Sequence, residues 1–141
     1  MRKILTALAI TATATAAGGF AAGSAAAAGE SLGCFIGPSR YPPSYPNQCV
    51  NSSMPSPTGT YSVTFQVVNP RSPETYAWSV PSTLISSETG GCTATTNYCS
   101  LANLRPTKVI TVSVTATSNG VPVTMSSTAD IEPWCGNQFC G

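Results

Sequence analysis

The last nine residues, PWCGNQFCG, hold two of the six cysteines and raise the question of redox chemistry. A catalytic dithiol usually has two residues between its cysteines, which places the first thiol at a helix N-terminus and lowers its pKa. Here four residues separate Cys135 from Cys140, and a single glycine follows. A helix has no room to form there. The spacing therefore predicts a structural disulfide that closes a terminal loop.

Acid–base and nucleophilic chemistry has few candidate residues. The chain has no histidine, which excludes Ser-His-Asp and Cys-His catalysis and most zinc sites. Lys108 could act as a base for a serine, but the chain has no Ser-x-x-Lys motif. Asp130 and Glu132 are the only close carboxylate pair and project from the outer face of a predicted strand. We interpret them as charges that discourage edge pairing, rather than as a glycosidase pair or a calcium site. We expect no enzymatic activity, no metal and no cofactor.

Aromatic side chains in loops are the remaining candidates for function. Rings held on disulfide-braced loops can stack on sugar faces or anchor a protein partner. The alternative is that they cover small satellite cores beneath those loops. The candidate binding residues are Arg40, Tyr41, Tyr45, Tyr98, Trp134 and Phe139.

The first 28 residues have the layout of a secretory signal peptide. Arg2 and Lys3 are followed by an apolar stretch and by four alanines that end at Ala28, after which we expect cleavage. The apolar stretch is shorter than the roughly 20 residues of a membrane span. We therefore expect a secreted protein with no membrane attachment after cleavage. The alanine- and threonine-rich leader favours a bacterial source.

Removal of residues 1–28 leaves four basic and five acidic residues, a net charge near −1. A nucleic-acid-binding protein would carry a basic stripe, and this chain has none. All six cysteines lie after residue 28 and would enter an oxidising compartment, which predicts a disulfide framework. Their grouping favours neighbours, although the N-terminal pair could instead cross to the C-terminal pair. The favoured pairs are Cys34 with Cys49, Cys92 with Cys99, and Cys135 with Cys140.

Two regions of the exported chain differ in their sequence pattern. Residues 29–59 are rich in Pro, Ser and Tyr, which predicts an arm of loops and turns. Residues 60–141 are expected to form a β-sandwich that ends in the disulfide-closed loop, because apolar residues alternate with polar ones in the runs between 61 and 131. The strands are expected at 61–68, 76–80, 109–117 and 121–132, more weakly at 82–87 and 98–104, with turns at 69–73, 88–91 and 118–120.

Several short strands at this spacing are typical of an all-β, antiparallel sandwich or small barrel. Val121, Val123, Met125, Ala129 and Ile131 are expected to face inward from the last strand. The residues predicted for the centre of the core are Phe65, Trp78, Ile110, Val112 and Val114.

Trp78 and the segment LRPTKVITVSVTA at 104–116 resemble the immunoglobulin-like superfamily, including bacterial PKD and fibronectin type III relatives. The resemblance implies an immunoglobulin-like β-sandwich with Trp78 as the core tryptophan of strand C. Two departures stand out. Ile110 occupies the usual position of the corner tyrosine, and Val112 that of the strand F cysteine of antibody domains. The core is therefore expected to lack a disulfide between its sheets, with the cysteines at the periphery.

Relatives of this fold mostly bind, adhere or space other modules, although a fold alone does not establish a function. We expect a secreted, non-enzymatic module that recognises an extracellular protein or polysaccharide. The alternative is a secreted inhibitor of an extracellular protease or amylase, with residues 88–99 as a protruding loop. The ligand and the oligomeric state stay open at this level.

Overall fold

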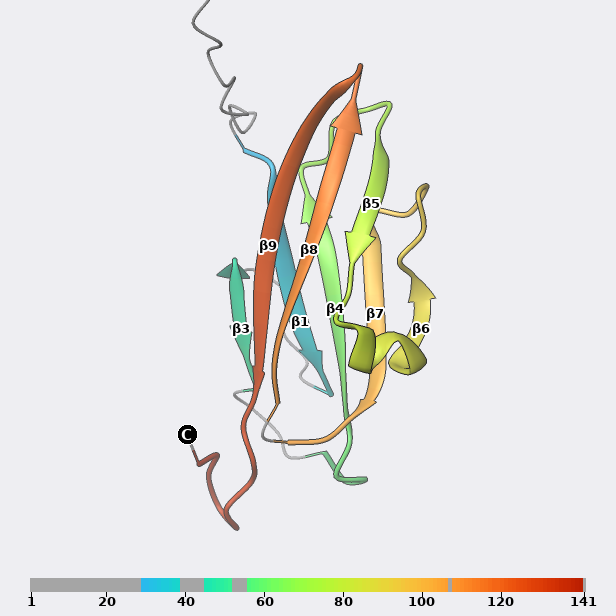
Figure 1. The fold of residues 1–141 in the computed structure, drawn as a ribbon. Coiled ribbons are helices and arrows are strands. Elements are labelled where there is room, and N and C mark those ends of the chain that lie inside the picture. Colours follow the sequence, from blue (N-terminus) through green and yellow to red (C-terminus); the bar gives the residue numbers. More distant parts are fainter. Residues whose placement is uncertain (1–28, 39–44, 52–55, 107, 141) are drawn as a thin grey trace, which may run out of the picture.

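A computed structural model describes residues 29–38, 45–51, 56–106 and 108–140. Across these ranges the chain is mostly β and forms two sheets that pack face to face around one core (Figure 1). Within the same ranges, no helix has the length and apolar character that crossing a membrane requires. The predicted leader lies outside the described residues, as do Arg40 and Tyr41.

The first sheet has five strands, and every neighbouring pair is antiparallel. Its central strand β4 alternates buried and exposed residues along its whole length, as a strand with one face on a core must. In spatial order the strands are β2 (Tyr45–Pro46), β1 (Ser31–Gly37), β4 (Tyr61–Val68), β7 (Tyr98–Leu104) and β6 (Glu88–Gly91).

The second sheet has four strands, of which β3 and β9 pair in parallel and the others are antiparallel. The long hairpin of β8 and β9 turns at Asn119 and Gly120, which both have positive φ. A two-residue turn of this kind matches the twist of the strands, and the turn predicted at 118–120 is confirmed. In spatial order the strands are β3 (Gln48–Val50), β9 (Val121–Ile131), β8 (Lys108–Ser118) and β5 (Thr75–Ser79).

The core lies between the sheets, with Phe65 as its largest fully buried side chain. Of the five predicted central residues, Phe65, Ile110, Val112 and Val114 are at most 2% exposed. Trp78 differs, because it lies on the edge strand β5 and is only partly buried against the rim of the core. Its Nε1 donates a hydrogen bond of 3.2 Å to the carbonyl oxygen of Thr96.

Four sequence-based expectations about local structure are wrong. In the predicted loop region 29–59, Ser31–Gly37 forms β1, pairs with β4 over its full length and buries three side chains in the core. Ser82–Ser87 is the 3-10 helix η1 rather than a strand. Glu88–Gly91 is β6 rather than a turn, because β7 supplies it with a partner. Val121 is exposed, since it lies next to the hairpin turn and beyond the facing sheet.

The three disulfides join the cysteine pairs that the sequence favoured. The expectation that all six cysteines lie at the periphery of the fold is wrong for the first pair. Cys34 on β1 of the first sheet is bonded to Cys49 on β3 of the second, and both side chains are buried. This bond connects the two sheets, so the expected absence of an inter-sheet disulfide is also wrong. The link lies on the N-terminal strands instead of the usual immunoglobulin pair of strands.

A bridging segment, residues 92–97, connects the sheets at the opposite edge. The backbone N–H of Val67 on β4 donates to Asn97 O at 2.8 Å, and that of Tyr76 on β5 donates to Ala94 O at 3.0 Å. The Cys92–Cys99 disulfide ties the start of the segment to β7. The two sheets are therefore connected on both sides of the sandwich, on one by a covalent bond and on the other by hydrogen bonds.

Replacement of both Cys34 and Cys49 by alanine is expected to lower the free energy of unfolding by about 3 kcal/mol. Loop-closure entropy for a ring of this size predicts that loss, and the buried bond also joins the two sheets. The matched control replaces Cys135 and Cys140, whose smaller ring lies on the surface and should stabilise less. Urea unfolding of the variants measures the difference. A smaller loss for the Cys34 and Cys49 variant than for the control would contradict this view of the fold.

Candidate functional site

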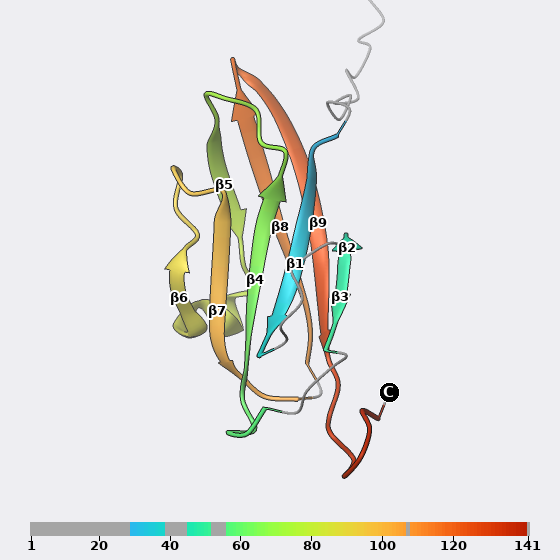
Figure 2. The same ribbon diagram turned by 180° about the vertical axis from the view of Figure 1, so that it is seen from behind.

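The terminal loop, residues 132–140, leaves the end of β9 and projects beyond one end of the two sheets (Figures 1 and 2). Its first residue is anchored by Asn51, which is 3% exposed. The Asn51 side-chain amide donates to Glu132 O at 2.9 Å, and its Oδ1 accepts from Glu132 N at 2.7 Å. This two-bond contact replaces the pairing that β9 loses as it leaves the sheet.

The terminal loop is a small closed hairpin. The Cys135–Cys140 disulfide joins its two arms. Cys135 N donates to Gln138 O at 2.8 Å, and Cys140 N donates to Pro133 O at 3.0 Å. An isolated bridge pairs Trp134 with Phe139. These bonds hold the two aromatic residues in a defined position without support from a larger core.

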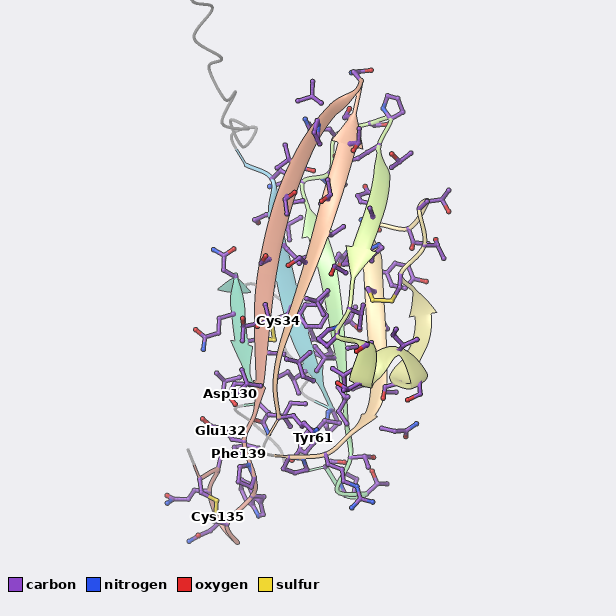
Figure 3. All side chains as sticks on the ribbon, viewed as in Figure 1. Cys34, Tyr61, Asp130, Glu132, Cys135 and Phe139 are labelled. Atoms are coloured by element: carbon purple, nitrogen blue, oxygen red, sulfur yellow. A yellow bond between two sulfur atoms is a disulfide. The ribbon has the colours of Figure 1, made fainter. Side chains whose placement is uncertain are left out.

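Trp134 and Phe139 form the aromatic surface of the terminal loop. Their ring centroids are 4.9 Å apart at an interplanar angle of 77°, an edge-to-face contact. Trp134 remains 38% exposed, and the amide side chains of Asn137 and Gln138 are exposed beside it. Residues 133–140 carry no charged side chain. Residues 133–140 therefore present an apolar ring together with neutral hydrogen-bonding groups. Figure 3 shows Phe139 of this loop near Glu132, at the end of β9.

The structure brings together two of the six predicted binding residues, Trp134 and Phe139. Tyr98 is 40% exposed, but it opens β7, at the end of that strand farther from the terminal loop (Figure 1). Tyr45 lies in β2, and its side chain is not among those described. Arg40 and Tyr41 lie outside the described residues, so their expected role in binding stays a prediction.

Another feature of the same end is an open cavity of about 310 Å³ between the ends of β1, β4 and β7. We call it the Asn103 cavity. It is lined by Gly37, Pro38, Ser56, Pro57, Thr58, Thr60, Tyr61, Ser62, Ala102 and Asn103.

A buried charge cluster at the opposite end was missed by sequence reasoning. Glu30 Oε2 lies 3.0 Å from Arg71 Nε, and Glu74 Oε1 lies 3.3 Å from Arg71 Nη2. The Tyr76 hydroxyl donates to Glu74 Oε2 at 2.9 Å. Both carboxylate side chains are 1% exposed. Asp130 and Glu132 are thus not the only close carboxylates, because folding joins residues more than 40 positions apart.

Burial is the main cause of the shifted pKa values in this cluster. It raises the pKa of Glu30 above its ordinary value of 4.5, and the neighbouring Glu74 raises it further, against the opposing effect of Arg71. Burial and the hydrogen bond to Glu74 raise the pKa of Tyr76 to about 12. The two carboxylates are buried, and the cluster ties the start of β1 to the β4–β5 connection, so we assign it a structural role.

Comparison with family models, with curated proteins and with solved structures found no match for this chain. Among the described residues, no group of three or more His, Cys, Asp or Glu side chains is placed to share a metal ion. The terminal loop and the Asn103 cavity are therefore identified as candidate binding sites from their geometry.

Substitution Asn51→Ala is expected to lower the free energy of unfolding by about 1–3 kcal/mol, since it leaves the backbone groups of Glu132 without their side-chain partner. Asn137→Ala removes an exposed amide from the terminal loop and is the control, with little expected change. Urea unfolding compares the two variants. Equal stabilities would show that the anchor contributes nothing.

Stability should depend on pH through Glu30. Because its pKa is raised in the folded state, the folded protein binds more protons, and this contribution to stability is present below about pH 4.5 and lost as pH rises through the folded pKa. In Glu30→Gln the side chain stays neutral, so the variant should gain stability relative to the unaltered protein as pH increases from 4 to 8. Urea unfolding of both proteins across this pH range tests the direction of the change in stability. Parallel pH profiles would contradict it.

Proposed function

We propose that this protein is a secreted, non-enzymatic, immunoglobulin-like module that binds an extracellular polysaccharide at its terminal loop. The observation that carries the proposal is the exposed Trp134, held against Phe139 on a disulfide-closed loop at one end of the molecule.

The strand order supports the immunoglobulin-like assignment. Constant-type immunoglobulin domains place strands A, B, E and D in one sheet and C, F and G in the other. The order β1-β4-β7-β6 facing β9-β8-β5 corresponds to that arrangement when the strands are lettered along the chain. The short strands β2 and β3 extend the two sheets where the chain passes from one to the other.

Export is supported by the leader pattern of residues 1–28 together with three disulfides, which persist in oxidising compartments. A role without catalysis is supported by the composition, because histidine is absent and the buried carboxylates of the charge cluster are engaged with Arg71 and Tyr76.

The chemistry of the terminal loop favours an uncharged polysaccharide over a protein. An indole ring can cover the apolar face of a sugar, while exposed amides hydrogen-bond its hydroxyls. Asn137 and Gln138 lie in the same loop as Trp134, and residues 133–140 carry no charged side chain that would select a charged partner. A rigid loop also loses little conformational entropy on binding.

An inhibitor of an extracellular hydrolase has less support. The loop expected to insert into such an enzyme, residues 88–99, includes strand β6 and the bridging segment, which is hydrogen-bonded to both β4 and β5. The bridging segment is therefore a structural connection between the two sheets.

Trp134→Ala should weaken binding to an insoluble polysaccharide at least tenfold, because central aromatic residues of an interface typically contribute about 2 kcal/mol or more. Tyr98→Ala is the matched control, with a ring of similar exposure far from the terminal loop. Co-sedimentation with chitin, cellulose and bacterial cell wall measures the affinity.

If the unaltered protein bound none of the three polymers, the proposed ligand class would be overturned. In that event, a Trp134-dependent complex with an extracellular protein would indicate the alternative partner. Inhibition of a protease or amylase at micromolar concentration would instead favour the inhibitor.

A further inference from the structure

We propose that the Asn103 cavity is a second binding site, which takes one uncharged sugar residue. The choice of a sugar as the ligand rests on the polysaccharide-binding function proposed above. The residues that form the cavity are different from those of the terminal loop. The cavity opens at the same end of the molecule as the terminal loop, where Tyr61 and Phe139 both lie (Figure 3).

An irregularity in the first sheet forms one wall of the cavity. Tyr61 pairs with Leu104, whereas Val63 pairs with Leu101, so β7 contains one residue more than β4 over this stretch. The extra residue is a β-bulge, a feature that re-aims side chains and often lies next to functional sites. At the bulge Asn103 has φ 57°, in the left-handed region that asparagine tolerates. Asn103 is one of the residues that line the cavity.

A glycine permits the close approach of β1 to β4 at the opposite wall. Gly37 pairs with Ser62, and a Cβ atom on Gly37 would lie 2.6 Å from Ser62 Oγ. With no side chain on Gly37, the Ser62 hydroxyl occupies that space, and both residues line the cavity. The buried ring of Tyr61 lies between these walls.

A chain of hydroxyl groups lines a third side. Ser56 Oγ lies 3.1 Å from Thr58 Oγ1, which in turn lies 3.0 Å from Thr60 Oγ1. Each hydroxyl can donate one hydrogen bond and accept two. Among the described residues, the two bonds of the chain leave one O–H and several lone pairs of these three groups for a ligand. Sugar hydroxyls have the same mixed capacity, so they are suitable partners.

Charge and size restrict the ligand class further. Among the described residues, those that line the cavity include no Asp, Glu, Lys or Arg, and this favours a neutral ligand over a phosphate, a carboxylate or an amine. A volume of about 310 Å³ lies at the lower end of the range for small-molecule sites. The site therefore suits a single neutral ring, such as one residue of a larger glycan, rather than a lipid or an extended peptide.

The test is an NMR titration of the protein recovered from the medium of a host given the full sequence, with cellobiose, maltose and N,N′-diacetylchitobiose as probes. Millimolar binding of at least one disaccharide should shift the amide signals of residues 56–62 and of Ala102 and Asn103. Glucuronic acid and glucosamine, which carry opposite charges, serve as comparison ligands and should bind more weakly.

Two variants with matched controls test the residues. Asn103→Gly deletes the amide yet suits the positive φ, and it should weaken disaccharide binding about fivefold. Its control is Asn119→Gly, the same change at a similar φ in the turn at the other end of the molecule. Thr58→Val removes the central hydroxyl and should have a similar effect. Its control is Thr115→Val, which removes one hydroxyl of the Thr115–Thr124 pair on the outer face of the second sheet.

Absence of shifts with all three disaccharides would overturn the proposal, as would equal binding by Asn103→Gly and Asn119→Gly, or tighter binding of either charged sugar. Trp134→Ala separates the two proposals. If it abolishes polysaccharide co-sedimentation while the shifts at residues 56–62 persist, both sites are supported. If the disaccharides shift only signals of residues 133–140, the terminal loop is supported and the cavity is rejected.

Discussion

The bond between Cys34 and Cys49 holds the two sheets together at the point where the chain passes from one to the other. Tyr45–Pro46 pairs with β1 in the first sheet, and Gln48–Val50 pairs with β9 in the second. A domain of this size buries a modest core, and the conformational entropy of the chain offsets most of that gain. A buried covalent link between the layers lowers the entropy of the unfolded chain and sets which strands lie opposite each other.

The two ends of the molecule differ in chemistry. The buried charges gather at one end, where Arg71 lies between the carboxylates of Glu30 and Glu74. The opposite end carries the aromatic pair of the terminal loop and the hydroxyl-lined Asn103 cavity. The terminal loop does not depend on the core for its shape, because its own disulfide and backbone hydrogen bonds close it. Recognition groups can thus project into solvent on a rigid support.

Sequence reasoning was most reliable where a signal was local and repeated. The alternation in 109–117 identified the inward face of β8, since period two has one physical meaning in a strand. It failed where a neighbour decides the outcome. Ser31–Gly37 lies in a stretch of turn-like composition, yet β4 offers it a partner along its whole length. Ser127 is polar but buried, because the pleat turns it inward regardless of its type.

The sequence by itself determined the all-β class and the aromatic terminal loop, and it favoured the observed cysteine pairs, because each depends on residues close together in the chain. The tertiary structure alone decided that one disulfide crosses between sheets, that Glu30 meets Glu74, and that a bulge at Asn103 faces Ser62. These contacts join distant segments whose register follows from strand pairing across the whole sheet. No local pattern encodes such a register, since every strand with the same alternation could pair in several ways.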